Sequence, residues 1–271
     1  MDRKQVEKEF HDRLRAVGTD EYVAETRWSP ELEETIKKNP LWVNMKYYAV
    51  ERASRAFVEQ WYEQHVEGMR VLDYCCGNGE DGVLIAGFGA TEVVGIDISE
   101  VSVENSQNLA VREGFADRVS HMVADAEDTG FEDSTFDIVT EYGSLHHLDL
   151  DKAFAELARV LKPGGKAICQ EAIRHNPLIH LYRKLTPSLR TPWEVPHILG
   201  RSSLNHAKRY FETIEVHHYH LVSLLSVPFR HTKLFNPLLS LLERVDQVLL
   251  SIPGLKWMAW QMVIVLSDPK K

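Results

Sequence analysis

The sequence predicts an α/β fold in which a doubly wound, seven-stranded, mostly parallel sheet carries helices on both faces. From Met69 onward, short apolar segments alternate with helical segments of about ten residues, which is the pattern of βαβ units. Right-handed crossovers between parallel strands place helices on both faces of the sheet. A glycine-rich turn, CCGNG at 75–79, separates the first apolar segment from a helical one.

The seven strands are expected where apolar, β-branched and aromatic residues gather between turn residues. They fall at 70–75, 92–97, 119–124, 136–141, 166–171, 211–222 and 257–267. Helices are expected near 80–87, 100–113 and 151–161, and LKPGG at 161–165 reads as a turn.

The residues before the first strand read as helical. Val6, Phe10 and Leu14 recur at three- and four-residue spacing. A second short helix is expected between Ser29-Pro30 and Asn39-Pro40, and a third from about Asn44 to His65, closed by Gly68. Two further helical stretches interrupt the later strands, a proline-punctuated one at 174–209 and a leucine-rich one at 223–256.

Composition excludes several classes of protein. With 44% hydrophobic and 26% charged residues among 271, the chain is expected to fold as a globular protein. A net charge of −9 disfavours a general nucleic-acid surface, which needs clustered Lys and Arg. Three cysteines (Cys75, Cys76 and Cys169) make no disulfide or zinc pattern, so a reducing, cytoplasmic location is expected. The longest apolar stretch, 257–266, is too short to span a bilayer, so no integral membrane association is expected.

The glycine loop indicates a nucleoside-containing cofactor. Gly77, Gly79 and Gly82 satisfy G-x-G-x-x-G between a strand and a helix, and Asp97 follows Gly77 by 20 residues at the end of the next strand. NAD and S-adenosylmethionine both fit this layout. Asp73, at the end of the first strand, would repel a pyrophosphate but tolerates a cofactor that carries an ammonium and a sulfonium. The sequence therefore favours S-adenosylmethionine.

Five motifs in order carry a family resemblance: VLDYCCGNG, GIDIS, VADAED, FDIVTEYGSLHHL and LKPGG. Together they resemble the class I S-adenosylmethionine-dependent methyltransferases, over about 70–171. The resemblance implies a Rossmann-like domain at 69–271 with helical lid insertions at about 174–209 and 223–256, preceded by an N-terminal helical cap at 1–68. One departure is that the first loop glycine common in the family is Cys75 here.

The resemblance implies a cofactor contact for each motif position. At the methionine end these are Asp73, the backbone of Cys75, Gly77 and Gly79, and the carbonyl of Glu141. At the nucleoside end, Asp97 would bond the ribose hydroxyls, Ile98 would pack on the adenine, Asp125 would accept from the adenine amine, and the Ala126 backbone would read the ring. The alternative is that these acids only cap helices or face solvent.

The acceptor side is expected beyond the fourth and fifth strands, because ligands of open α/β sheets collect at the carboxyl ends of the strands. The fourth strand delivers Tyr142, His146 and His147 there, and the fifth delivers Glu171. Histidine is the natural base near neutral pH, although a capping or packing role is the alternative. A base is needed only if the acceptor must lose a proton.

Two observations bear on the acceptor. The fourth strand ends in Glu141-Tyr142-Gly143-Ser144, not in the Asn/Asp-Pro-Pro-Tyr/Phe pattern of enzymes that methylate nucleic-acid amines. Aromatic residues favour an apolar or aromatic small molecule with an oxygen or carbon nucleophile, such as a specialised metabolite or a quinone-like or isoprenoid-like compound. These aromatic residues lie in two regions. Tyr22, Trp28, Trp42, Tyr47 and Tyr48 precede the first strand, and His175, Tyr182, Trp193 and His197 lie in the insertion after the fifth.

Two other functions stay open: an NAD-dependent oxidoreductase, and a non-catalytic, cofactor-binding regulatory subunit. Homo-oligomerisation is also left open. No metal site is expected. His217, His218 and His220 lie on one predicted strand with alternating faces, and no Asp, Glu or Cys is spaced to complete a metal site, which favours histidines that face solvent.

Overall fold

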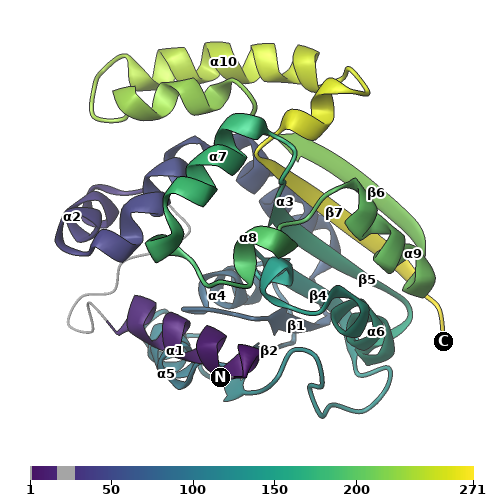
Figure 1. Ribbon diagram of the computed structural model, residues 1–271. Helices are drawn as coiled ribbons and strands as arrows, with labels where there is room; N and C mark the ends of the chain where they lie inside the picture. Colours follow the sequence, from purple (N-terminus) through teal and green to yellow (C-terminus); the bar gives the residue numbers. More distant parts are fainter. Residues whose placement is uncertain (1, 17–27) are drawn as a thin grey trace.

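The structure of this chain, a computed structural model, describes residues 2–16 and 28–271 (Figure 1). Within these residues seven strands form one sheet in the order β3-β2-β1-β4-β5-β7-β6. β7 runs in the opposite direction to the other six strands. The predicted seven-stranded, mostly parallel sheet is confirmed. The strands are β1 (Arg70–Tyr74), β2 (Glu92–Asp97), β3 (Val119–Val123), β4 (Phe136–Tyr142), β5 (Leu161–Ala172), β6 (Phe211–Tyr219) and β7 (Gln261–Pro269).

Three strand boundaries differ from the predicted ones by more than two residues. β5 begins at Leu161, but its pairing with β4 jumps from Leu161 to Lys166, so the predicted LKPGG turn leaves the ladder inside the strand. β6 ends at Tyr219 because His220 takes a positive φ of 65°. β7 begins at Gln261, since the residues before it include a 3₁₀ turn, η6 (Leu255–Met258).

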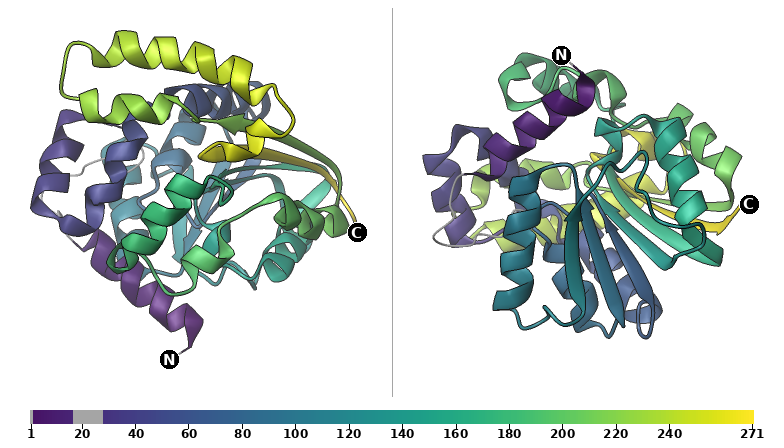
Figure 2. Two further views of the ribbon diagram at one scale, coloured as in Figure 1. Left: turned by 45° about the horizontal axis from the view of Figure 1, so that its top comes forward. Right: turned by 90° about the horizontal axis from the view of Figure 1, so that it is seen from below.

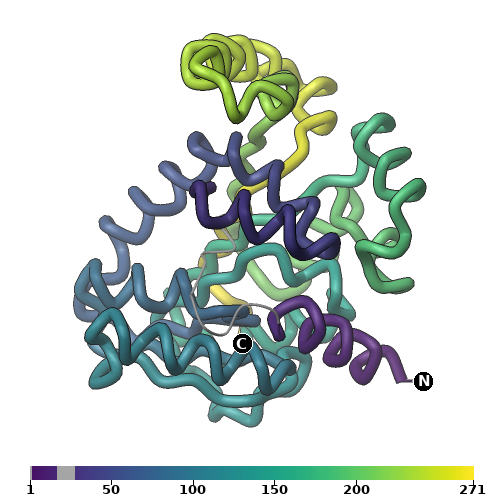
Figure 3. Tube along the Cα trace, turned by 90° about the vertical axis from the view of Figure 1, so that its left-hand side faces the viewer, coloured from purple at the N-terminus to yellow at the C-terminus, as the bar shows by residue number. Residues whose placement is uncertain are grey.

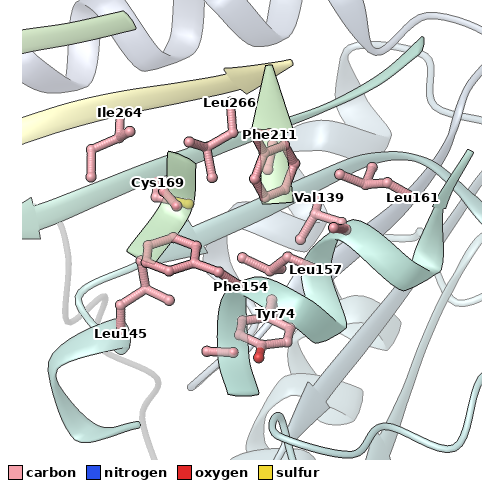
Figure 4. Packing of buried hydrophobic residues seen from close by; sticks show 14 of the residues in the cluster. Tyr74, Val139, Leu145, Phe154, Leu157, Leu161, Cys169, Phe211, Ile264 and Leu266 are labelled. Carbon is pink, nitrogen blue, oxygen red and sulfur yellow. The ribbon is translucent and has the colours of Figure 1, made fainter. Parts of the chain in front are cut away.

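Helices cover both faces of the sheet. Because side chains alternate along a strand, neighbouring residues of β4 serve opposite cores. Ile138 faces a core with α3 and α4, whereas Val139 faces one with α6 and α9 (Figure 4). The helices of the two layers are α3 (Arg52–His65), α4 (Glu80–Gly87), α5 (Glu100–Arg112), α6 (Leu150–Val160) and α9 (Leu204–Tyr210).

The N-terminal region is helical as predicted, with one correction. α1 (Arg3–Arg15) packs on α5, and α2 (Pro30–Lys38) has the predicted limits. The single helix predicted from Asn44 to His65 is instead a 3₁₀ helix, η1 (Pro40–Val50), followed by α3. Winding at three residues per turn aligns Trp42 and Met45, which pack together against α2.

The two predicted insertions are helical. The first holds α7 (Pro177–Leu185), η3 (Pro187–Leu189), α8 (Glu194–His197), η4 (Arg201–Ser203) and α9, and the second holds η5 (Ser223–Phe229) and α10 (Phe235–Leu250). The left-hand view of Figure 2 and Figure 3 show α1, η1 and α7 arranged around one end of the sheet, with α10 above them. The division into a cap at 1–68 and a domain at 69–271 stays a prediction.

Gly79 in the β1–α4 loop is required by close packing. Its φ is +81°, and a Cβ added there would lie 2.6 Å from the Cβ of Ser106 on α5. The loop therefore lies directly against α5, which leaves the opposite side of the loop for a ligand.

A buried polar cluster joins the start of α3 to the sheet. Glu51 accepts a hydrogen bond from the Tyr142 hydroxyl at 2.5 Å and another from the Gln261 amide. Ser54 lies 2.8 Å from His220 Nε2. His220 is buried, so the expectation of solvent-facing histidines on β6 is wrong for this residue. Burial raises the pKa of Glu51 to about 7.

We expect Gly79→Ala to destabilise the fold more than Gly164→Ala. Gly164 also has a positive φ, of 75°, but an added Cβ there meets nothing within 4 Å. Alanine at such a φ costs about 1–2 kcal/mol, and overpacking at Gly79 should add about 1–3 kcal/mol. Urea unfolding of both variants measures the difference, and equal losses would contradict the packing role.

We expect Glu51→Gln to reduce the pH dependence of stability. The folded state holds the Glu51 proton up to about pH 7, whereas the ordinary value is 4.5. Wild-type stability should therefore fall as pH rises from about 4.5 to 7, by at most about 1.4 kcal/mol per pH unit from this group. Gln cannot ionise, so the variant should match wild type near about pH 5 and exceed it near about pH 7.5. Equal slopes in urea unfolding would contradict this assignment.

Candidate active site

A cavity of about 510 Å³ lies beyond the carboxyl ends of β1, β4 and β5. Asp73, Tyr142 and Gln170 reach it from these strands, and α1, η1, α7 and η5 enclose it from the other side. Its remaining wall combines apolar and aromatic side chains with polar and charged ones, among them Asn44, Arg183 and Glu194. This composition is typical of a pocket for an organic molecule.

A smaller cavity of about 80 Å³ adjoins the first. Its wall contains Asp97, Ile98, Asp125 and Ala126, the four residues predicted to hold the nucleoside. The two cavities share wall residues: His11, Arg15, Cys75, Tyr142, Gly143 and His147. The structure therefore brings the predicted nucleoside residues together, next to the larger cavity.

Asp97 is tied to the glycine loop. Its Oδ2 accepts from the Gly77 amide at 3.0 Å and its Oδ1 accepts from the Ser99 amide at 2.9 Å. Cys75 has a φ of 59°, a conformation that favours glycine, which accounts for the glycine common at this position in the family it resembles. Cys75 and Gly77 line the large cavity, whereas Gly79 packs on α5 and does not line it, and its predicted contact with the cofactor stays a prediction.

Asp73 is a buried carboxylate without a full set of partners. Its Oδ2 has no hydrogen-bond partner among residues 2–16 and 28–271, and the side chain borders the large cavity. Burial and the neighbouring Asp81 raise the pKa of Asp73. Asp81 itself is neutralised by Arg55, 2.6 Å away. The Asp73 carboxyl group borders the large cavity, although its Oδ2 is buried against Gly82 of α4, and its acidic character suits the ammonium of S-adenosylmethionine, so the residues present fit this cofactor.

Helix α1 covers the small cavity, which sequence reasoning missed. Lys4 pairs with Asp125, and Arg3 pairs with Glu127. Asp12 accepts a hydrogen bond from Ser99 at 2.6 Å, directly after β2. Lys4 thus occupies an oxygen of the carboxylate that was predicted to accept from adenine. The basic residues in the first turn of α1 were the available signal, but nothing local assigns their partners.

Glu141 lines neither cavity. Its Oε1 accepts from the Ser144 hydroxyl at 2.7 Å and from the Leu145 amide at 3.2 Å, and so holds the turn η2 (Leu145–His147). Burial, with the charge of Glu171 added, raises the pKa of Glu141. The predicted contact between its carbonyl and the cofactor stays a prediction.

His146 and Glu171 form a buried pair. His146 Nδ1 lies 2.7 Å from Glu171 Oε2. His146 lines the large cavity, whereas Glu171 lies behind it and does not reach either cavity. Burial lowers the pKa of His146 to about 3 and raises that of Glu171 to about 7. The predicted acceptor contact of Glu171 stays a prediction; in the structure its side chain contacts His146 and does not line either cavity.

His147 connects β4 to α1. Its Nδ1 lies 2.9 Å from Glu7 Oε2, and Glu7 Oε1 accepts from the Thr191 hydroxyl at 2.6 Å. Burial is the largest single effect on His147 and lowers its pKa, but the hydrogen bond to Glu7 and the charges of Glu194, Glu7 and Glu171 together outweigh it and raise the pKa. The ligand atoms of Glu7, His147 and His11 lie within 4.8 Å of one another. Arg15 Nη1 is 3.2 Å from His11 Nδ1, and this cation disfavours a metal ion there.

Only some of the predicted aromatic residues border the large cavity. Tyr47, Tyr48 and Tyr182 do, together with Phe10 and Trp260, which were not singled out from the sequence. Five others lie outside the cavity wall, and Tyr22 lies outside the described residues; the five are Trp28, Trp42, His175, Trp193 and His197.

Comparisons with known proteins match the part of the chain that contains the glycine loop and the fourth strand. The family model described as "Methyltransferase domain" matches residues 71–165. A 27-O-demethylrifamycin SV methyltransferase of Amycolatopsis mediterranei is 41% identical over 100 residues, which are 36% of this chain and 37% of the relative. A sterol 4-C-methyltransferase of Caenorhabditis elegans is 37% identical over 142 residues, 48% of this chain and 42% of the relative. This chain thus matches less than half the length of either relative.

The solved structures show the same fold. A geranyl diphosphate methyltransferase in complex with S-adenosylmethionine superposes with a TM-score of 0.55, covering 83% of this chain and 90% of that chain. At 18% identity this likeness speaks for the fold alone. The matched segment contains the glycine loop, Asp97, Asp125 and the His146 turn. This chain therefore carries a methyltransferase domain of the class I family, whose cofactor is S-adenosylmethionine.

Proposed function

We propose that this chain transfers a methyl group from S-adenosylmethionine to a small organic acceptor bound in the large cavity. The observation that carries the proposal is the junction of the two cavities at Cys75, Tyr142 and Gly143. A cofactor with its nucleoside in the small cavity would present its other end to the large one across this junction. When bound, the cofactor supplies an electrophilic methyl group on a sulfonium.

The chain's own contribution is mainly to hold the reactants and exclude water. Asp73 places its carboxyl group at the large cavity, and Asp97 holds the loop that separates the two cavities. Helix α1 closes the small cavity with ion pairs to Asp125 and Glu127. Close positioning of donor and acceptor away from water supplies much of the rate in such displacements.

The cavity wall supports an apolar or aromatic acceptor that carries an oxygen or carbon nucleophile. Tyr47, Tyr48, Tyr182 and Trp260 offer flat apolar surfaces. The two relatives are named for a rifamycin and a sterol, both small organic molecules. We infer an acceptor of similar kind here, such as a specialised metabolite or a quinone-like or isoprenoid-like compound.

His146 is the base that the geometry supports. With Glu171 ionised and Nδ1 protonated, the ring donates to Glu171 Oε2, which leaves Nε2 to accept a proton from the acceptor. His146 contacts the cavity and is the proposed catalytic residue. Glu171 is a positioning residue, because it fixes the tautomer and the orientation of the ring.

We expect Asp97→Ala to weaken binding of S-adenosylhomocysteine by at least about 1–3 kcal/mol, the value of a lost hydrogen bond to a charged group. Asp97→Asn is the matched variant, since it keeps one oxygen for the Gly77 or Ser99 amide. Its loss should be smaller. Calorimetry measures both, and an unchanged dissociation constant in Asp97→Ala would refute the ribose contact.

Calorimetry also distinguishes a methyltransferase from the alternative, an NAD-dependent oxidoreductase. Wild-type protein should bind S-adenosylhomocysteine and give no response to NADH, because the carboxylate of Asp73 would face the pyrophosphate. Tight NADH binding without a response to S-adenosylhomocysteine would end the methyltransferase proposal. A metabolite extract supplied with cofactor labelled in the methyl group then separates an enzyme, which transfers label, from a silent cofactor-binding subunit.

We expect His146→Ala to lower label transfer by about 10²–10⁴-fold without changing the affinity for S-adenosylhomocysteine. In wild type the rate should rise as pH passes about 7, because Glu171 must be ionised to orient the ring. Glu171→Gln should remove this rise. His206→Ala, which changes a histidine on α9 outside both cavities, is the control. An unchanged rate and pH profile in Glu171→Gln would contradict the positioning role.

A further inference from the structure

Helix α10 carries an apolar stripe on its outer side. Leu241, Val245 and Val248 are all exposed and follow one another at four- and three-residue spacing, so they lie on one face. Leu234 and Ile252 extend this stripe beyond both ends of the helix and are also exposed. The inner face is a separate one, which includes Phe235 and Leu239, both buried. Val248 is 67% exposed, a large fraction for a residue on the side of a packed helix.

A second exposed apolar face belongs to α7 and η5, of which η5 packs against α10. On α7, Leu178, Leu181 and Leu185 share one side of the helix and are 53–78% exposed. On η5, Leu225 is 65% exposed. Leu178 and Leu225 also line the large cavity, so the apolar surface continues into its wall. The left-hand view of Figure 2 shows both α7 and α10 on the side turned to the reader.

The charges of these elements differ in sign from those of the chain as a whole. The segments 177–185 and 223–256 hold six Lys and Arg residues and two acids, a formal charge of +4 in a chain of −9. Neither acid is open to the outside: Asp246 is buried under three backbone amides, and Glu243 pairs with Arg52. Lys184, Lys233 and Arg244, in contrast, are exposed.

We propose that the outer faces of α7, η5 and α10 dock the protein on the surface of a membrane that contains anionic lipids. Apolar side chains would enter the boundary between headgroups and acyl chains, and the exposed lysines and arginine would contact the negative headgroups. No helix in the described part of the chain is long and apolar enough to cross a membrane. The contact is therefore a peripheral one along the length of α10.

A membrane fits this surface better than a second copy of the chain does. Two copies joined through α10 would bring exposed basic residues of the same sign together, without acids on either side to pair with them. An anionic bilayer satisfies the apolar stripe and the positive charges at the same time. Leu178 and Leu225 belong both to this surface and to the cavity wall. If the proposed methyl transfer is correct, the acceptor is therefore a lipid-soluble molecule that enters the cavity from the bilayer.

Sedimentation with vesicles tests the docking without any acceptor or cofactor. The probe is phosphatidylcholine with about 30% phosphatidylglycerol, compared with phosphatidylcholine alone. Wild-type protein should sediment with the anionic vesicles, and added salt should reduce binding. Leu241→Glu with Val248→Glu should lower the partition coefficient at least about tenfold. Val111→Glu is the matched control, because Val111 is 66% exposed on α5, outside the docking surface.

Three results would overturn the proposal: no sedimentation of wild type, equal binding of the double variant and wild type, or equal loss of binding in Val111→Glu. A dimer in light scattering that the double variant dissociates, without vesicle binding, would assign the surface to a second copy. Leu241→Ser with Val248→Ser, a milder pair, should also bind vesicles less. Calorimetry with S-adenosylhomocysteine checks that each variant is folded, and its outcome on wild type tests the methyltransferase proposal separately.

Discussion

Negative charge gathers at the edge where the parallel strands end, and the rest of the site is arranged around it. Asp73, Asp97, Asp125, Glu141 and Glu171 all lie at or just beyond the carboxyl ends of β1 to β5. Burying an ionised carboxylate without partners is costly, so each needs a donor, a cation or a proton. Asp97 uses loop amides, Glu141 uses the following turn, Glu171 uses His146, and Asp125 uses Lys4. Asp73 Oδ2, Glu141 Oε2 and Glu171 Oε1 each have no hydrogen-bond partner in the described part of the chain, and of these three residues Asp73 is the one that borders the large cavity.

The same constraint explains why α1 lies where it does. A helix with Arg3 and Lys4 in its first turn is drawn to Asp125 and Glu127, and Glu7 then reaches His147. These contacts are partly buried, where pairs are screened less than on the surface. The helix is held by polar contacts with residues that the sheet positions, and it completes two cavities that the sheet alone would leave open.

The sheet and the glycine loop could be predicted because their signals are local. Alternating apolar and polar segments locate strands, and Gly77 with Asp97 locates the loop and the next strand end. The contacts of α1 could not be predicted, since Lys4 and Asp125 are 121 residues apart and neither position is distinctive alone. The sequence predicts Trp260 only as part of a strand, and nothing local places it in the cavity wall. His220 was read as solvent-facing, because nothing local shows that Ser54 would bury it.

The position of α1 has a consequence for the order of events. Phe10 belongs to the wall of the large cavity, Lys4 belongs to that of the small one, and His11 belongs to both. Because residues of α1 line both cavities, this one helix closes both of them. Any movement of α1 that admits a ligand to one cavity therefore unseals the other, so filling and emptying the two are not independent kinetic steps.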